Sequence, residues 1–321
     1  MSQNIEFPPV ENGLDYLESA IGYLQGSPSP HDLKYAVLHL QAAAEVLLKV
    51  RLMREHWSLV FRSPDKANLV DFKSGDFQSI GLEEALTRLK GIATVDLPVG
   101  ARESLKALAK ERNKLQHFGL VTQRIAIESI AGKVLDALLC FINEHLRPGA
   151  DQDELDAFDR IQDIIRDEMK RITALVKARW ERINPELDHL AEYVITCPGC
   201  LQLALLHDGS RAHCRFCDRI WEDMDDLAVE YAGSVLHLSW YEVQAGAEPP
   251  VRACPDCGHE TLLADVLVRD DPTNSNWLCL NCGMKTKEND IRPCTSCSEL
   301  MHHDEDSVIC SSCWEAVISR D

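Results

Sequence analysis

Cysteine spacing is the sequence feature that most constrains how this chain can fold. Twelve of the thirteen cysteines fall into six Cys-x-x-Cys pairs after residue 196. Spacers of 13, 21 and 12 residues separate the first pair from the second, the third from the fourth and the fifth from the sixth. The pairs are Cys197/Cys200, Cys214/Cys217, Cys254/Cys257, Cys279/Cys282, Cys294/Cys297 and Cys310/Cys313. Each pair can present two thiolates on one tight turn, so two pairs supply the four ligands of a tetrahedral metal site. The sequence therefore predicts three metal sites.

Metal binding is favoured over disulfide bonds by the expected cellular location. Residues 1–13 contain neither a basic start nor an apolar segment, so we expect no export signal and a cytoplasmic protein. In a reducing compartment, Cys-x-x-Cys pairs indicate metal ligands. No stretch approaches the ~20 apolar residues of a membrane span, so no membrane association is expected.

The predicted sites are structural, and zinc is the expected metal. A closed shell of four thiolates with this spacing favours zinc over iron and leaves no open coordination position for catalysis. Turn residues such as Pro198, Gly258 and Gly283 flank the pairs, and residues 203–206 and 261–263 are expected to form short strands. The pattern resembles three tandem zinc ribbons, at residues 196–245, 246–288 and 289–321. In the third, a short helix is expected over residues 314–319, and His302 or His303 could replace a cysteine ligand.

Charge is distributed unevenly along the chain. Of the formal net charge of −19, residues 197–321 contribute −13, with 9 Lys/Arg against 22 Asp/Glu, whereas residues 1–150 contribute −1. A zinc ion with four thiolates adds a formal charge of −2 at each site. Arg211, Arg215 and Arg219 are too sparse to attract a phosphate backbone strongly. We therefore expect RNA, if it binds, at the N-terminal part and a protein partner at the ribbons.

Four aromatic residues in the ribbon region allow two interpretations. Trp221, Trp240, Tyr241 and Trp277 could form an exposed surface that binds protein or stacks on bases, or they could fill the small cores of the ribbons.

Residues 1–150 are predicted to form an all-α bundle. Apolar residues at three- and four-residue spacing predict helices over about 14–24, 31–57, 82–90, 101–118 and 122–146, and Ser29-Pro30 is a helix start. The polar, turn-rich residues 62–81 predict a loop.

Residues 151–195 are predicted to form a long amphipathic connecting helix. One apolar seam runs from Leu155 to Ile183, and Asn184-Pro185 interrupts it. The seam could pack on the bundle or on a second copy of the chain. The expected fold class is thus mainly α: a helical bundle, a long connecting helix and small β-rich modules.

A short motif in the bundle points to chemistry. Residues 112–117 read Arg-Asn-Lys-Leu-Gln-His, on a helix whose Arg102, Lys106, Lys110 and Lys114 form one basic stripe. Arg112 and His117 match the Arg-x4–6-His signature, with Asn113 at the preferred polar position. Together with the bundle and the acidic Glu45 on an early helix, residues 14–147 resemble the HEPN superfamily.

This resemblance implies a catalytic set and a dimer. Many HEPN proteins are metal-independent endoribonucleases in toxin, antiphage and RNA-processing systems, which act as dimers with both motifs facing the interface. By resemblance, Glu45 would orient Arg112 and Asn113 would bond near the scissile group. A histidine suits proton transfer and an arginine suits phosphate oxygens. Residues five apart lie about 140° around a helix axis, so Arg112 and His117 converge only through a frayed helix end or the second copy.

Two other interpretations stay open at this point. The bundle could be an inactive dimer that acts as an adaptor, with Arg112 paired to Glu45 structurally and His117 capping its helix. A zinc-dependent enzyme is disfavoured, because three closed sites use all twelve paired cysteines.

Overall fold

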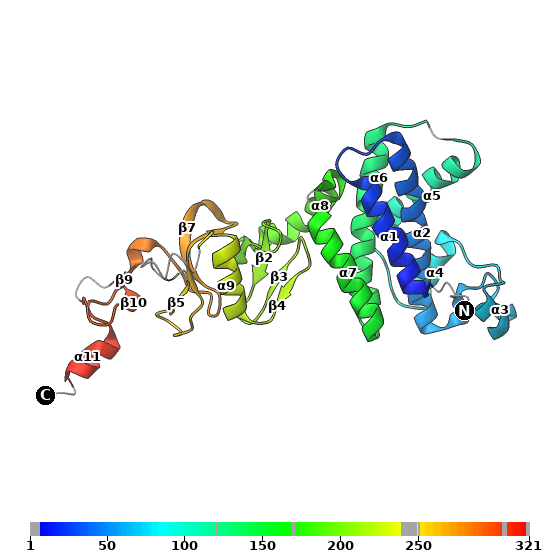
Figure 1. Cartoon of the computed structure of the whole chain (residues 1–321). Helices are drawn as coiled ribbons and strands as arrows, with labels where there is room; N and C mark the ends of the chain where they lie inside the picture. The colour runs from blue at the N-terminus through cyan, green and yellow to red at the C-terminus, as the bar shows by residue number, and fades with distance from the viewer. Residues whose placement is uncertain are drawn as a thin grey trace, which may run out of the picture. The chain divides into compact units, whose positions relative to one another are not determined.

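The chain divides into two compact units, residues 1–180 and 181–321, which are described separately. The computed structural model describes residues 7–119, 121–168, 171–238, 249, 251–303 and 307–318. The first unit is helical and the second is rich in strands, as the sequence predicts (Figure 1). Among the described residues, no helix combines the length and hydrophobicity that a membrane span requires.

The first unit is built around α2. Its helices are α1 (Pro9–Leu24), α2 (Pro30–Glu55), α3 (Leu69–Ser74), α4 (Leu82–Gly91), α5 (Val99–His117), α6 (Arg124–Phe141) and α7 (Gln152–Glu168), with the first part of α8 (Thr173–His189). Short helical turns η1 (Trp57–Val60), η2 (Pro64–Lys66) and η3 (Ile142–Leu146) join them. α2 packs against α1, α4, α5 and α6, and it buries Leu40, Ala44 and Leu48 completely. Ser29 caps it through the expected N-terminal turn, with Pro30 at its first position.

The segment between α2 and α4 is more ordered than the predicted loop. It contains η1, η2 and α3, and Phe61 pairs with Ser79 in an antiparallel bridge. Phe61 and Phe77 stack with ring centroids 4.0 Å apart, and Trp57 and Phe72 pack beside them. These aromatic contacts, which turn-residue composition does not reveal, hold the segment together.

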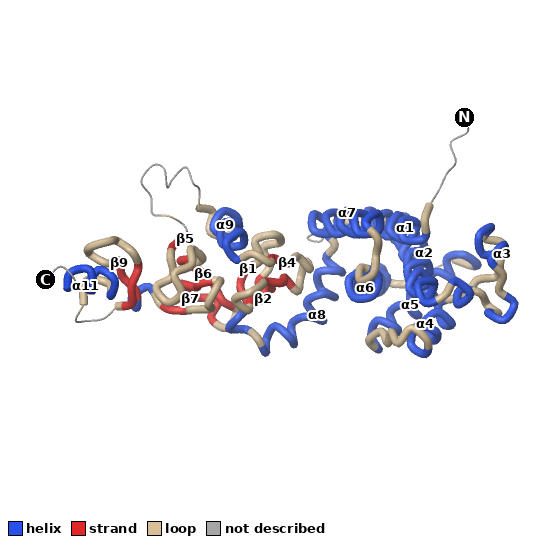
Figure 2. The backbone as a smooth tube through the Cα atoms, turned by 90° about the horizontal axis from the view of Figure 1, so that it is seen from below, coloured by secondary structure: helices blue, strands red, loops and turns tan. Residues whose placement is uncertain are grey.

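The predicted long helix after residue 150 is wrong: the segment forms two helices, α7 and α8. Ile172 is not helical, and the Arg171 carbonyl accepts a hydrogen bond of 3.0 Å from the Gly26 amide in the α1–α2 turn. Pro185 lies inside α8 and does not begin a separate segment. The apolar seam of α7 packs back on the bundle, against α1, which settles one of the two packing alternatives for this helix (Figure 2).

α6 and α8 make a close contact that fixes the last part of this unit. A Cβ atom on Gly132 would lie 2.5 Å from the backbone of Ala174, so only glycine fits at this crossing. One turn further along α6, Asp136 forms an ion pair of 2.7 Å with Arg179 of α8. Both side chains are buried, with 7% and 1% of their surfaces exposed.

The second unit contains one large sheet and one small one, all of whose pairs are antiparallel. The strands are β1 (Val194–Thr196), β2 (Leu203–His207), β3 (Ala212–Cys214), β4 (Ile220–Trp221), β5 (Val251–Arg252), β6 (Leu262–Val268), β7 (Asp271–Cys279), β8 (Lys285–Thr286), β9 (Ile291–Pro293) and β10 (Leu300–His302). Among the described residues the large sheet runs in the order β4-β3-β2-β1-β6-β7-β8, and β5 also pairs with β6. Helices α9 (Met224–Ser234) and α11 (Ser311–Ile318) and the turns η5 (Ala191–Tyr193) and η6 (Glu288–Asp290) complete the unit.

The first two ribbon segments share the large sheet. Ile195 of β1 pairs with Leu205 of β2 on one side and with Val268 of β6 on the other. Gly209, in the β2–β3 turn, approaches the second segment so closely that a Cβ atom would lie 2.5 Å from the Asn281 carbonyl oxygen. The third segment has its own two-stranded sheet, and its Leu300 packs against the core of the second around Cys254.

Candidate metal centres and a lysine-rich cleft

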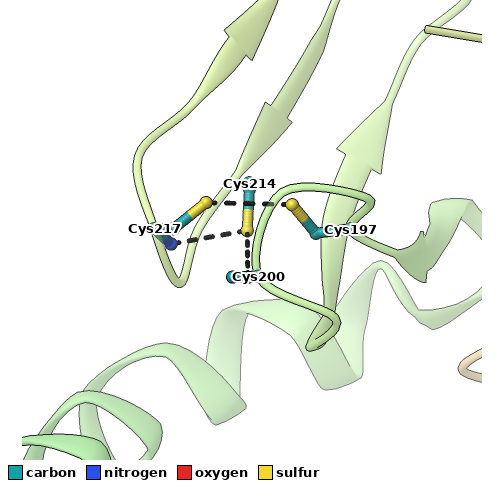
Figure 3. A group of neighbouring side chains, drawn as sticks. All are labelled: Cys197, Cys200, Cys214 and Cys217. Carbon is teal, nitrogen blue, oxygen red and sulfur yellow. Dashed lines mark hydrogen bonds between the residues drawn. The ribbon is translucent and has the colours of Figure 1, made fainter. Parts of the chain in front are cut away.

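Three groups of four cysteines gather in the second unit, as the spacing predicts. They are Cys197/Cys200/Cys214/Cys217, Cys254/Cys257/Cys279/Cys282 and Cys294/Cys297/Cys310/Cys313, and within each group the sulfur atoms lie within 4.8 Å of one another. Figure 3 shows the first group converging from two loops. The closest sulfur pairs are 3.7–3.8 Å apart, which matches the edge of about 3.8 Å for a tetrahedron with metal–sulfur bonds of about 2.3 Å. Disulfides would need about 2.05 Å. Each group could therefore hold one metal ion.

Five of the six Cys-x-x-Cys turns have the same backbone. In each, the amide of the residue after the second cysteine donates to the carbonyl of the first, at 2.8–3.0 Å. That following residue adopts the left-handed backbone conformation in all five turns, with φ between 59° and 76°. These residues are Leu201, Asp218, Gly258, Gly283 and Ser298. The amide of the first cysteine closes the turn with a carbonyl five residues on. This repeated geometry points both sulfur atoms of a pair to one side, as a metal knuckle requires.

The sixth turn is helical. Cys313 lies in α11, which starts at Ser311 and confirms the short helix expected after the last pair, although it begins earlier. The Cys310 amide donates to the Cys294 sulfur at 3.2 Å, and the Ser296 amide donates to the same sulfur at 3.4 Å. These backbone amides lower the pKa of the Cys294 thiol to about 6, which favours the thiolate that a metal needs.

Burial decreases from the first group to the third. All four cysteines of the first are buried, and burial raises the pKa of Cys214 well above its ordinary value in the absence of a cation. In the second group Cys282 is exposed, and in the third only Cys294 is buried. A metal ion in the first group would thus be shielded from solvent, whereas one in the third would be accessible.

The other residues that the sequence singled out in this unit have structural roles. His302 hydrogen-bonds to Asp256 at 2.6 Å, and the third metal group consists of four cysteines without it. Trp221 is buried and Trp277 packs against the core of the second segment, so both fill small cores. Trp240 and Tyr241 lie outside the described residues.

The first unit contains a cleft of about 850 Å³ beside the predicted motif. One wall is α5, and a second wall is formed by Arg62 together with residues from Gln78 to Glu84; Gln41 and Glu45 of α2 also line the cleft. The lining includes three of the four predicted catalytic residues, Glu45, Asn113 and His117, together with the basic stripe at Lys106, Lys110 and Lys114. The structure therefore brings one acid, one amide and one histidine to a common lysine-rich space.

Arg112 does not line this cleft. α5 stays helical as far as His117, so the frayed end that would bring Arg112 and His117 together does not occur. The Arg112 guanidinium donates instead to its neighbour Asn113 at 3.0 Å. Glu45 accepts from Gln41 at 3.0 Å and lies 3.9 Å from Lys49. In the described part of the chain no hydrogen bond or ion pair joins Glu45 to Arg112, so neither an orienting nor a structural pairing of these two is present.

Four lysine and arginine side chains line the cleft, and two of them are neutralised by carboxylates. Lys106 pairs with Glu83 and Lys114 with Glu111, both at 2.7 Å. Within the described ranges, Lys110 and the Arg62 side chain make neither an ion pair nor a hydrogen bond. The cleft therefore offers two free positive charges, one on each wall.

Nothing in the sequence indicated that Arg62 and residues 78–84 would form the second wall of the cleft. Arg62, Gln78 and Ser79 stand in a polar stretch whose composition predicts only a loop. No spacing in the sequence marks them as neighbours of α5, because their position depends on the aromatic stack behind them.

The comparisons with known proteins do not assign a family. No model of a known protein family matches the chain, and neither curated proteins nor solved structures give a significant match. The class that the fold and the sites define is therefore a helical unit joined to a strand-rich unit with three four-cysteine groups, each able to hold a metal ion.

Proposed function

We propose that this protein is a HEPN-type, metal-independent endoribonuclease that works as a homodimer and carries three structural zinc sites. The observation that carries the proposal is the common cleft of Glu45, Asn113 and His117 with its lysine stripe. In RNA cleavage the 2′-hydroxyl attacks the neighbouring phosphate, which requires a proton acceptor, a donor to the leaving oxygen and positive charge near the phosphate. His117 is exposed and suits the proton transfers, and Lys110 suits the phosphate.

A second copy of the chain supplies Arg112 in this proposal. Since Arg112 does not line the cleft of its own chain, it would serve the cleft of the partner. An apolar patch beside the motif suits such an interface. Phe118, Val121 and Ile125 follow the motif in the sequence, and these large apolar side chains are exposed by 96%, 103% and 76%. Burying this patch against a second copy brings two motifs together.

The zinc sites act as structural elements and partner-binding modules in the proposal. Their four-cysteine shells suit zinc and leave no open coordination position. Arg215 is paired with Glu186 at 2.8 Å and Arg219 with Glu230 at 2.6 Å, so few cations there remain for phosphate. RNA is therefore assigned to the first unit.

Cleavage of total RNA in the presence of EDTA tests the proposal. We expect wild-type protein to cut and His117→Ala to lose about 10²- to 10⁴-fold in rate, the usual contribution of one general acid or base. His31→Ala, an exposed histidine of α2 outside the cleft, is the matched control and keeps full activity. Equal cleavage by His117→Ala and wild type, or none by either, refutes the ribonuclease. A Phe118→Asp/Ile125→Asp variant tests the dimer by light scattering, with a monomer expected.

An inactive adaptor is the second candidate, favoured by the C-terminal helix. Trp314, Val317 and Ile318 of α11 are all more than half exposed, which suits a protein-binding surface. An adaptor predicts that His117→Ala changes no activity of the protein, whereas a Trp314→Ser variant loses its partner.

A further inference from the structure

The second wall of the cleft carries a polar pair whose side chains make no hydrogen bond or ion pair in the described part of the chain. Arg62 and Gln78 both line the cleft and both are exposed. Their backbones are directly paired, since the Arg62 amide donates to the Gln78 carbonyl at 2.9 Å. The two side chains are thus held next to each other on one edge of the cleft.

The backbone under this pair is fixed from several directions. The Arg88 guanidinium of α4 donates to the carbonyls of Leu59, Phe61 and Arg62 at 2.6, 2.7 and 3.2 Å. Phe61 and Phe77, whose rings stack, are the sequence neighbours of Arg62 and Gln78. The Ile80 amide donates to the Val60 carbonyl at 3.0 Å. A backbone held at this many points presents its side chains with little ordering cost on binding.

Arg62 and Lys110 differ from the two other cations that line the cleft. Lys106 and Lys114 each face a carboxylate at 2.7 Å. Arg62 has no such partner in the part of the chain that the structure describes, and Lys110 is its counterpart on α5. A planar guanidinium binds a phosphate through two parallel hydrogen bonds. The amide of Gln78 offers both a donor and an acceptor, the pair of groups that recognises a base edge.

We propose that Arg62 and Gln78 form an anchoring subsite for single-stranded RNA, in which Arg62 holds a backbone phosphate and Gln78 the edge of the adjacent base. The subsite rests on the proposed ribonuclease function and defines its substrate class. A strand bound there crosses the cleft from the segment after α2 to Lys110 and His117 on α5. A duplex, whose base edges are paired, is a poor ligand for this subsite.

Binding of an uncleavable RNA tests this separately from cleavage. The probe is a fluorescent single strand of about twelve nucleotides with 2′-O-methyl groups, which cannot undergo attack by the 2′-oxygen. Affinity is measured by anisotropy over a range of salt concentrations. One lost phosphate contact lowers the slope of log K against log salt by about 0.7 for a single strand. We expect this change in slope for Arg62→Ala and a partial recovery of the slope for Arg62→Lys. For Gln78→Ala we expect a lower affinity with an unchanged slope.

The control is Lys66→Ala, which removes the same charge from the same segment outside the cleft. The Arg62 side chain supports no structural bond in the described chain, so its loss leaves the helical circular dichroism unchanged. A slope for Arg62→Ala equal to that of Lys66→Ala overturns the subsite, whether or not wild type cleaves RNA. A lowered slope supports it, and a wild type that binds through Arg62 without cutting native RNA refutes only the proposed catalysis.

Discussion

Asp136 and Arg179 provide the sharpest test of how the helical unit is held together. Their ion pair of 2.7 Å is almost fully buried, so solvent screens it little. Asp136→Asn keeps the shape of the side chain and leaves the arginine charge buried without its counter-ion. Breaking a buried pair in this way costs about 3–5 kcal/mol. We expect the contact between α6 and α8 to weaken by that amount.

Hydrogen exchange read by mass spectrometry is the suitable assay. The chain has two units, so a single melting temperature does not describe it, whereas peptides from α6 and α8 report their own opening free energies. Asp163→Asn is the matched control. It removes a similar bond of 2.8 Å to Arg166 on α7, where the carboxylate is 68% exposed, and such surface pairs contribute about 0–1 kcal/mol.

The double substitution Asp136→Leu/Arg179→Met distinguishes the cost of an orphaned charge from the value of the pair itself. Apolar replacement of a buried pair is often neutral or stabilising, so the double variant is expected to exchange more slowly than Asp136→Asn. An Asp136→Asn effect below about 1 kcal/mol, equal to that of the control, would refute the assignment of this pair as a fixed internal contact.

Three further predictions concern the folded units. His207 is 3% exposed, and burial lowers its pKa to about 4, so folding favours its neutral form. The stability that His207 contributes is therefore present above pH 6.5 and falls by about 3 kcal/mol as the pH is lowered towards 4. His207→Phe should show a smaller difference in the free energy of urea unfolding between these two pH values. Limiting peroxide should release metal first from the third cysteine group, because only one cysteine of that group is buried. Peptide mapping should find Cys297 oxidised before Cys197, and first release from the first group would contradict this. Gly132→Ala should destabilise the α6–α8 crossing by about 1–3 kcal/mol, as measured by hydrogen exchange of peptides from α6 and α8. Gly91→Ala, whose new Cβ atom would meet no atom within 4 Å, should leave that exchange unchanged.

The sequence predicts those parts of the fold that depend on local signals. Helix periods place α2, α4, α5 and α6 within a few residues, and Ser29-Pro30 marks the start of α2 because its capping bonds are local. The metal groups follow from spacing, since each knuckle closes within six residues. Residues 314–319 are correctly predicted as helical up to Ile318, the last residue described there.

What the sequence misses depends on contacts between distant residues. The apolar period runs without change through the junction of α7 and α8, and the break there is accompanied by a bond from Gly26, far away in sequence. The pairing of Ile195 with Val268 likewise leaves no local pattern. The resemblance to HEPN proteins grouped Glu45, Asn113 and His117, and these three residues line one cleft. The side on which Arg112 lies depends on α5 remaining regular to its end.

The β1 strand has a consequence for how metal is taken up. Because β1 hydrogen-bonds to both β2 and β6, ordering the first four-cysteine group also orders an edge on which the second is built. Filling one site then lowers the conformational cost of filling the other, which is positive coupling between two ions that share no ligand. The third group has a separate two-stranded sheet and does not share a strand with the second in the described residues. A zinc titration of the apo-protein should therefore show cooperative binding of the equivalents that fill the first two groups.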